Sequence, residues 1–164
     1  MKTRKRKAGK KRLPVTKEVF YGMKYIVLVS HGTFAPGMHN ALKMLAGEER
    51  EDILSTSLEN GMGSDVYMEN VRKCVEKITP KDEILLLGDL VGGSPLTLAA
   101  NVIAERGLLP KTVMIGGVNM PLALSAALMK DEMELDELAD VLLAESREVM
   151  QEFKITQDDE EEEL

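Results

Sequence analysis

The sequence predicts an α/β fold, a small doubly wound and mostly parallel four-stranded sheet with helices on both faces. Short apolar runs of strand type alternate with longer stretches whose apolar residues recur at helical spacing, and this alternation is typical of βαβ units. The 164 residues are enough for one domain with a substantial core. A content of 44% hydrophobic and 30% charged residues is the ordinary balance of a globular chain.

Four strands follow from the apolar runs. The third run is almost wholly apolar, which predicts a central strand, whereas the second alternates with polar residues and is expected at an edge. In chain order, the strands are expected at Lys24 to Ser30, Asp52 to Leu58, Glu83 to Leu87 and Thr112 to Ile115.

Five helical stretches separate and follow these strands. Proline near a first turn, serine at a start and glycine at an end mark their limits. Cys74 lies on or beside the apolar face of the second stretch, so we interpret it as a packed small hydrophobe rather than a nucleophile. The stretches run from about Pro36 to Gly47, from Ser64 to Ile78, from Ser94 to Gly107, from Leu122 to Met129 and from Leu135 to about Phe153.

Charge is distributed unevenly along the chain. The net charge is −7, yet residues 1–22 carry nine Lys or Arg against one Glu, and the remaining residues carry 12 basic and 27 acidic side chains. An acidic body repels phosphate, which argues against nucleic acid as a partner. It favours a partner protein with a basic or mixed docking face.

Three segments are expected. Residues 23–155 form the domain, because Met23 opens the first well-patterned strand. The basic leader 1–22 is expected to be disordered or to be a mis-called start. Residues 156–164 end in a run of Asp and Glu and are expected to form a disordered acidic tail.

The sequence also predicts a cytoplasmic location. No apolar run approaches the ~18 residues that a membrane helix needs, so no membrane insertion is expected. The basic start is not followed by an apolar stretch of signal-peptide type. A single cysteine excludes an internal disulfide and suits a reducing compartment.

Two strand ends carry the candidate chemistry. His31 follows the first strand and Asp89 follows the third, and the carboxyl ends of parallel strands are where open α/β sheets place their sites. If these strands are neighbours, Asp89 faces His31. A carboxylate that accepts a hydrogen bond from one imidazole nitrogen fixes the tautomer and leaves the other nitrogen as a nucleophile.

A glycine-rich turn, Gly92-Gly93-Ser94-Pro95, opens the helix after the third strand. Ser94 is expected as its N-cap and Pro95 as its first helical residue. The free N–H groups of such a helix start bind anions, and Gly93 lets the backbone approach a ligand closely. An alternative is a strand-to-helix turn without a ligand. If the anion is a phosphoryl group, then His31, Asp89 and this helix start together supply the positioning and charge stabilisation that phosphoryl transfer requires.

No cofactor and no metal are expected. His39, eight residues after His31, is interpreted as solvent-facing, and no dense cluster of Cys, His and carboxylates completes a zinc site. The sequence lacks a Walker A lysine pattern and a full dinucleotide glycine fingerprint. A Ser-His-Asp hydrolase using Ser94 or Ser30 would lack the Gly-x-Ser-x-Gly nucleophile elbow.

Together these residues resemble the enzyme IIA domain of the mannose family of the bacterial phosphoenolpyruvate-dependent sugar phosphotransferase system. The resemblance spans about residues 23–155. Three motifs carry it in order: Ser30-His31-Gly32, then Gly88-Asp89 with Gly92 to Pro95, then Gly116 to Pro121.

The resemblance implies a phosphohistidine carrier for sugar transport. His31 would accept the phosphoryl group from the histidine-containing phosphocarrier protein and pass it to a IIB component, Asp89 would orient the ring, and Gly93 and Ser94 would hold the phosphoryl oxygens. It also implies a homodimer that exchanges a C-terminal strand, whose counterpart here is near Glu152 to Thr156. Two alternatives stay open: the phosphoryl-donor subunit of a dihydroxyacetone kinase, and a regulatory binding module without turnover.

Overall fold

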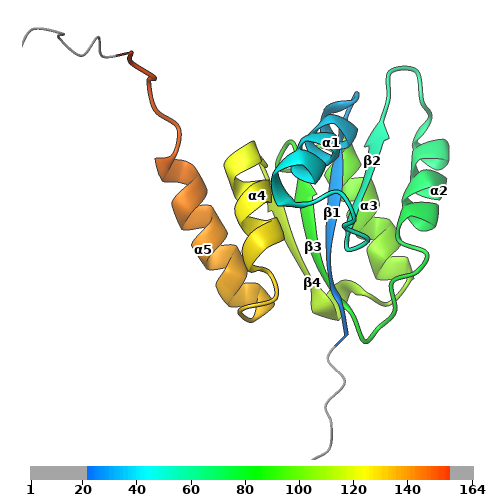
Figure 1. Cartoon of the computed structure of the whole chain (residues 1–164). Helices are drawn as coiled ribbons and strands as arrows, with labels where there is room; N and C mark the ends of the chain where they lie inside the picture. The colour runs from blue at the N-terminus through cyan, green and yellow to red at the C-terminus, as the bar shows by residue number, and fades with distance from the viewer. Residues whose placement is uncertain (1–21, 156–164) are drawn as a thin grey trace, which may run out of the picture.

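The computed structural model of the chain describes residues 22–155, and the expected leader and acidic tail lie outside this range apart from Gly22. Strands and helices alternate along the chain (Figure 1). The elements are β1 Lys24–His31, α1 Phe34–Ala46, β2 Ile53–Leu58, α2 Ser64–Cys74, β3 Glu83–Gly88, α3 Ser94–Glu105, the short 3₁₀ helix η1 Leu109–Lys111, β4 Thr112–Gly116, α4 Met120–Met129 and α5 Leu135–Glu148.

The four strands form one parallel sheet in the order β2-β1-β3-β4, with β1 and β3 in its centre. The sequence correctly predicts the central place of β3 and the edge place of β2. The chain winds outward from β1 to β2, then crosses back and winds outward from β3 to β4. The direction of winding therefore changes between β1 and β3. In open α/β sheets, the carboxyl end of this switch point is where ligands bind.

Helices cover both faces of the sheet (Figure 1). Alternate residues of β1 point to opposite faces: Ile26 and Leu28 pack in the core under α1, α4 and α5, while Val27 and Val29 pack in the core under α2 and α3. Because both faces are buried, the central strands need the continuous apolar runs that identified them in the sequence.

Several helix limits differ from the prediction. Asn119 caps α4 through its side chain, which accepts a hydrogen bond from the Leu122 N–H at 2.9 Å, so α4 begins two residues earlier than expected. The second helix ends at Cys74 rather than Ile78. The last helix ends at Glu148, and residues 151–155 form no helix or strand.

The expected serine caps of two helices are wrong. Gly63 and Gly93 hold the N-cap positions of α2 and α3 with extended backbones, and Ser64 and Ser94 are the first helical residues. The carbonyls of both glycines accept the first helical bond, at 3.0 Å in each case. A glycine before the serine lets the chain turn one residue earlier, so the serine hydroxyl is free for another role.

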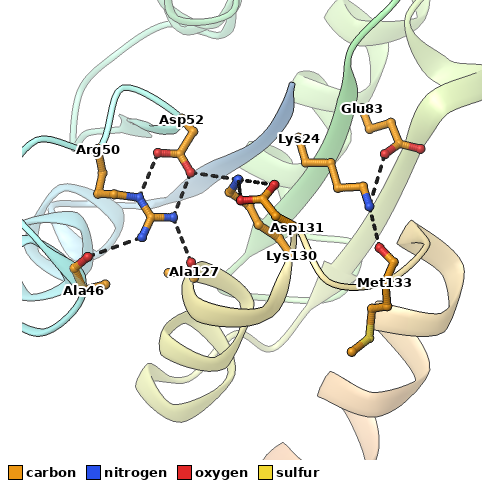
Figure 2. A network of polar contacts seen from close by, with 9 residues as sticks. All are labelled: Lys24, Ala46, Arg50, Asp52, Glu83, Ala127, Lys130, Asp131 and Met133. Atoms are coloured by element: carbon orange, nitrogen blue, oxygen red, sulfur yellow. Dashed lines mark hydrogen bonds and ion pairs between the residues drawn. The ribbon is translucent and has the colours of Figure 1, made fainter. Parts of the chain in front are cut away.

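Charged side chains form a network of ion pairs and hydrogen bonds at the amino-terminal edge of the sheet (Figure 2). Asp52, one residue before β2, accepts hydrogen bonds from both Nε and Nη2 of Arg50, at 2.9 and 2.8 Å. Its Oδ2 lies 3.0 Å from Nζ of Lys130, whose side chain is only 4% exposed and also contacts Asp131. The network attaches the end of α4 to the start of β2 at the edge opposite His31.

A candidate phosphoryl-transfer site

His31 is the last residue of β1 and lies at the carboxyl edge of the sheet. Its side chain belongs to the row of Val27 and Val29, which faces α2 and α3, but it extends past the core and remains 45% exposed. The main chain continues into Gly32, whose φ of 57° is in the left-handed region that favours glycine. A sharp turn thus leaves the imidazole at the rim of the sheet.

Asp89 directly follows β3 and binds His31 twice. Register pairs Val29 of β1 with Gly88 of β3, so the next residues of the two strands lie together across the switch point. Oδ2 of Asp89 accepts a hydrogen bond from the backbone N–H of His31 at 2.9 Å and lies 2.9 Å from its Nδ1. An ionised carboxylate can accept hydrogen bonds but cannot donate them. This contact therefore favours the tautomer with the proton on Nδ1 and leaves Nε2 with a lone pair.

The environment of Asp89 favours its ionised form. Partial burial acts to raise the pKa of its carboxyl group, but the hydrogen bonds from His31 and from the Leu90 N–H lower the pKa below its usual value. Oδ1 accepts the Leu90 bond at 2.9 Å, so both oxygens are engaged. The carboxylate is therefore negative at neutral pH and stabilises positive charge on the imidazole ring.

Gly93 lies against the His31 ring. A Cβ at this position would be 3.1 Å from Cε1 of His31 and 3.2 Å from Cβ of Leu90. The loop reaches this arrangement through Gly92, with φ of 71°, and through a bond from the Gly93 N–H to the Leu90 carbonyl at 3.3 Å. A Cβ here would be in tight contact with the ring, so any larger residue would require the ring or the loop to shift by a few tenths of an ångström.

Helix α3 begins beside this loop with unused donors. Within residues 22–155, the amide N–H groups of Ser94 and Leu96 and the Ser94 hydroxyl make no hydrogen bond, and Pro95 has no N–H. Free amides at a helix start attract anions. The structure thus brings His31, Asp89 and Gly93 together and places Ser94 at the start of the adjoining helix.

Ser30 has a structural task that the sequence did not reveal. Its side chain is fully buried, and its Oγ accepts a hydrogen bond from the Ala35 N–H at 2.7 Å, which satisfies a free donor at the start of α1. This burial removes Ser30 from consideration as a hydrolase nucleophile. The serine lies five residues before the amide that it binds, with a glycine turn between them. This spacing is not a known capping pattern, so the hydrogen bond could not be predicted from the sequence.

The expectation for His39 is wrong. Its side chain does not face solvent: Nδ1 bonds Oγ of Ser55 on β2 at 2.8 Å, and Nε2 is buried without a partner among the described residues. Burial, with a smaller contribution from Lys43, lowers the pKa of His39. Edge strand β2 carries polar residues on its α1 face, and His39 packs on them. It is therefore separate from the His31 site.

Other chemistry-bearing groups lie apart from His31. Burial raises the pKa of the Cys74 thiol to about 11, which keeps it protonated and unreactive at neutral pH. Residues 22–155 contain no group of three or more His, Cys, Asp or Glu side chains placed to hold a metal ion. In the same range, no helix has the length and apolar character needed to cross a membrane.

Comparison with known proteins identifies the family. The mannose-type family model described as "PTS system fructose IIA component" matches residues 25–143, nearly the whole α/β domain. The chain belongs to this IIA family of the phosphotransferase system. IIA components are phosphotransferase carriers, so the chain has a general transferase role within a sugar transport system.

Two curated relatives agree with this assignment. The fructose-specific EIIA component of Bacillus subtilis is 28% identical over 126 residues, which cover 77% of this chain and 84% of the relative. The mannose-specific EIIAB component of Escherichia coli is 25% identical over 130 residues, which cover 79% of this chain. The chain spans only 39% of the length of that second protein.

Solved structures show the same fold. An EIIA component from Streptococcus agalactiae is 27% identical, with a TM-score of 0.68 over 79% of this chain and 97% of that one. The mannose/sorbose-specific IIA subunit from Enterococcus faecalis is 22% identical, with a TM-score of 0.69 over 82% of this chain and 98% of that one. The predicted fold class is thereby confirmed.

Proposed function

We propose that this IIA component carries a phosphoryl group on Nε2 of His31, accepting it from the histidine-containing phosphocarrier protein and passing it to a IIB component for sugar uptake. The observation that carries the proposal is the double contact of Asp89 Oδ2 with the backbone and ring of His31. It holds Nδ1 and leaves Nε2 as the free nucleophilic nitrogen of an exposed ring. We place this relay in the cytoplasm.

The proposed transfer needs only the donor's phosphohistidine, His31 and Asp89. The Nε2 lone pair of His31 forms a bond to phosphorus as the donor's P–N bond breaks, and the bonding electrons leave with the donor imidazole. Positive charge develops on the His31 ring, where the ionised Asp89 stabilises it. The reverse sequence passes the group to the IIB nucleophile, so no metal or cofactor is required.

The start of α3 supplies the anion contacts. We assign the backbone at Gly93 and the hydroxyl and amide of Ser94 to the phosphoryl oxygens. The close approach of Gly93 to the ring that would carry the group supports this assignment. A neutral hydroxyl with no other partner in the described range is suited to a ligand that is present only part of the time.

Apolar side chains around the site suit a partner protein. Phe34 begins α1 and Leu90 and Val91 follow Asp89; all three are exposed, Val91 by 83%. Phe34 lies three residues after His31 in the chain, and Leu90 and Val91 lie within two residues of Asp89. Such exposed apolar groups beside a reacting atom are typical of a docking surface.

We further propose a homodimer that exchanges its C-terminal segment. Phe153 and Ile155 are 88% and 82% exposed, and β4 is an edge strand whose outer side pairs with no other strand within residues 22–155. Alternating apolar residues on an otherwise unpacked segment fit addition to a sheet edge of a second copy.

Radiolabel transfer tests the function. The protein is incubated with labelled phosphoenolpyruvate, the general phosphotransferase enzyme and the phosphocarrier protein, alongside His31→Ala and the matched control His39→Gln. We expect label on wild type and on the control but none on His31→Ala. Label that persists on His31→Ala would reject the assigned carrier.

The alternatives differ in the fate of the label. A binding module would take no label from a matched set of donor proteins. A dihydroxyacetone kinase subunit would pass its label to a kinase partner and dihydroxyacetone rather than to a IIB component. The Gly92-Gly93-Ser94-Pro95 turn and the family assignment favour the sugar-transport partner.

A further inference from the structure

Tyr67 is a buried polar residue with no part in the transfer step itself. It lies in the first turn of α2, and its side chain is fully buried among the residues packed between the sheet and α2 and α3. It is the largest of the fully buried side chains in the described range. A tyrosine in such a place needs a partner for its hydroxyl.

The partner is in the first turn of α3. The Tyr67 hydroxyl donates a hydrogen bond to the backbone carbonyl of Pro95 at 3.0 Å. A carbonyl at the second position of an α-helix already accepts the amide four residues further along, so the helix itself does not require this bond. The bond instead attaches the start of α3 to α2, 28 residues earlier in the chain.

The attached turn is the one beside the reacting histidine. Pro95 follows Gly93 and Ser94, and Gly93 lies so close to the ring that an added Cβ would be 3.1 Å from Cε1 of His31. The Gly93 carbonyl also accepts the Thr97 N–H at 3.0 Å, which joins the loop to the first turn of α3. A shift of this turn therefore changes the distance from the free amides to His31.

We propose that Tyr67 is a positioning residue for phosphoryl transfer: its hydroxyl holds the start of α3 at the distance from His31 that the transferred group requires. This inference rests on the proposed function of His31. Among the described residues the Tyr67 hydroxyl makes no hydrogen bond to His31, so its proposed action is through the Pro95 carbonyl. Near reacting atoms, small displacements of a binding group cost rate rather than stability.

Tyr67→Phe tests the proposal, because it removes one oxygen and keeps the ring. Tyr25→Phe is the matched control: Tyr25 is in the same core, 7% exposed, at the opposite end of β1, and its hydroxyl has no hydrogen bond within residues 22–155. The measurement is the single-turnover rate of phosphoryl transfer from the phosphocarrier protein, over a range of donor concentrations.

We expect Tyr67→Phe to lower the maximal rate about five- to tenfold, as for the loss of one neutral hydrogen bond. The donor concentration at half-maximal rate is expected to stay unchanged, because the exposed docking residues are untouched. Tyr25→Phe is expected to match wild type. An unchanged maximal rate in Tyr67→Phe, or an equal loss in both variants, would overturn the positioning role.

A wild-type measurement covers the case in which Tyr67→Phe does not fold. With ¹³C-labelled tyrosine, phosphorylation should shift the ring resonance of Tyr67 and leave that of Tyr25 in place; equal shifts, or none, would contradict the proposal. Wild type that takes no label at all refutes the proposed function together with this inference. Wild type that is labelled normally while Tyr67→Phe transfers at full rate refutes the inference alone.

Discussion

A single carboxylate oxygen, Oδ2 of Asp89, lies 2.9 Å from both the backbone nitrogen and the ring Nδ1 of His31. The backbone contact attaches the end of β1 to the end of β3, and the ring contact sets the direction of the imidazole. One residue thus holds both the backbone and the ring of the histidine, and under the proposed function it leaves Nε2 as the nitrogen that would react. This relationship between two strand ends is the basis of the proposed function.

Asp89→Asn is expected to fold and to transfer slowly. The amide oxygen still accepts one hydrogen bond, but the negative charge that stabilises the reacting ring is gone. Hydrogen bonds to charged groups contribute about 1.5–3 kcal/mol, which predicts a rate loss of about 10- to 100-fold. The measurement is the single-turnover rate of His31 phosphorylation.

Asp82→Asn is the matched control for that variant. Asp82 also accepts backbone hydrogen bonds, from Met23 and Thr79 at 2.8 Å each, but before the start of β3 at the far edge of the sheet. Its substitution should leave the transfer rate unchanged. Equal rates for Asp89→Asn and wild type would remove Asp89 from the mechanism.

Gly93→Ala is expected to disturb the site without unfolding the protein. The new methyl group would lie 3.1 Å from Cε1 of His31, so either the ring or the loop must move by a few tenths of an ångström. We expect transfer to slow by about tenfold and the His31 ring resonances to shift. Both are read from the purified variant by kinetics and by NMR.

Gly37→Ala provides the corresponding control. Gly37 lies in α1 and has no atom within 4 Å of its added Cβ, so alanine should raise the free energy of unfolding by about 0.5–1 kcal/mol with no effect on transfer. A similar loss of transfer in both variants would mean that the Gly93 effect is not specific to the His31 contact.

The ion network at the opposite edge predicts an acid-sensitive part of the stability. The hydrogen bonds from Arg50, opposed by partial burial and supported by Lys130, lower the pKa of Asp52. A carboxyl group whose folded pKa is depressed stabilises the fold above its unfolded pKa, about 4, and this contribution is lost as the pH falls below it.

Asp52→Asn should therefore reduce the free energy of unfolding by about 1.5–3 kcal/mol at pH 7, because the buried Lys130 loses one of its two carboxylate partners. The difference from wild type should shrink as the pH is lowered from 5 to 3. Urea unfolding at several pH values measures it. A difference that is constant across this range would show that the charge of Asp52 is not the cause.

The proposed dimer depends on the segment after α5. Sedimentation of the full chain should give twice the monomer mass, and a chain that ends at Glu148 should sediment as a monomer while keeping its folded spectrum. Replacing Phe153 and Ile155 together by Ser should weaken the dimer in the same direction. A full chain that sediments as a monomer at micromolar concentration would contradict the exchange.

Much of the architecture could be predicted because it depends on burial. Strands β1 and β3 are buried on both faces, so nearly all of their residues must be apolar. The resulting apolar runs predict these strands directly from the sequence. His31 and Asp89 could be selected as candidates from the sequence because each lies two residues after such a run. Their contact could not be predicted, since the strand order that makes β1 and β3 neighbours depends on crossovers that no local pattern records.

The errors come from groups whose roles depend on distant contacts. His39 looked solvent-facing because its partner, Ser55, is on another element. Ser94 looked like an N-cap because serine has that preference, whereas the preceding glycine takes the position. Tyr67 gave no signal, because the carbonyl that its hydroxyl binds is 28 residues away.

The most direct test of the proposed mechanism is the position of the phosphoryl group on the histidine ring. Long-range ¹H–¹⁵N correlation spectra of the phosphorylated, ¹⁵N-labelled protein distinguish the two ring nitrogens and the two histidines. We predict phosphorylation of His31 at Nε2, with Nδ1 still protonated beside Asp89. A phosphoryl group on Nδ1 of His31, or on His39, would contradict the central claim.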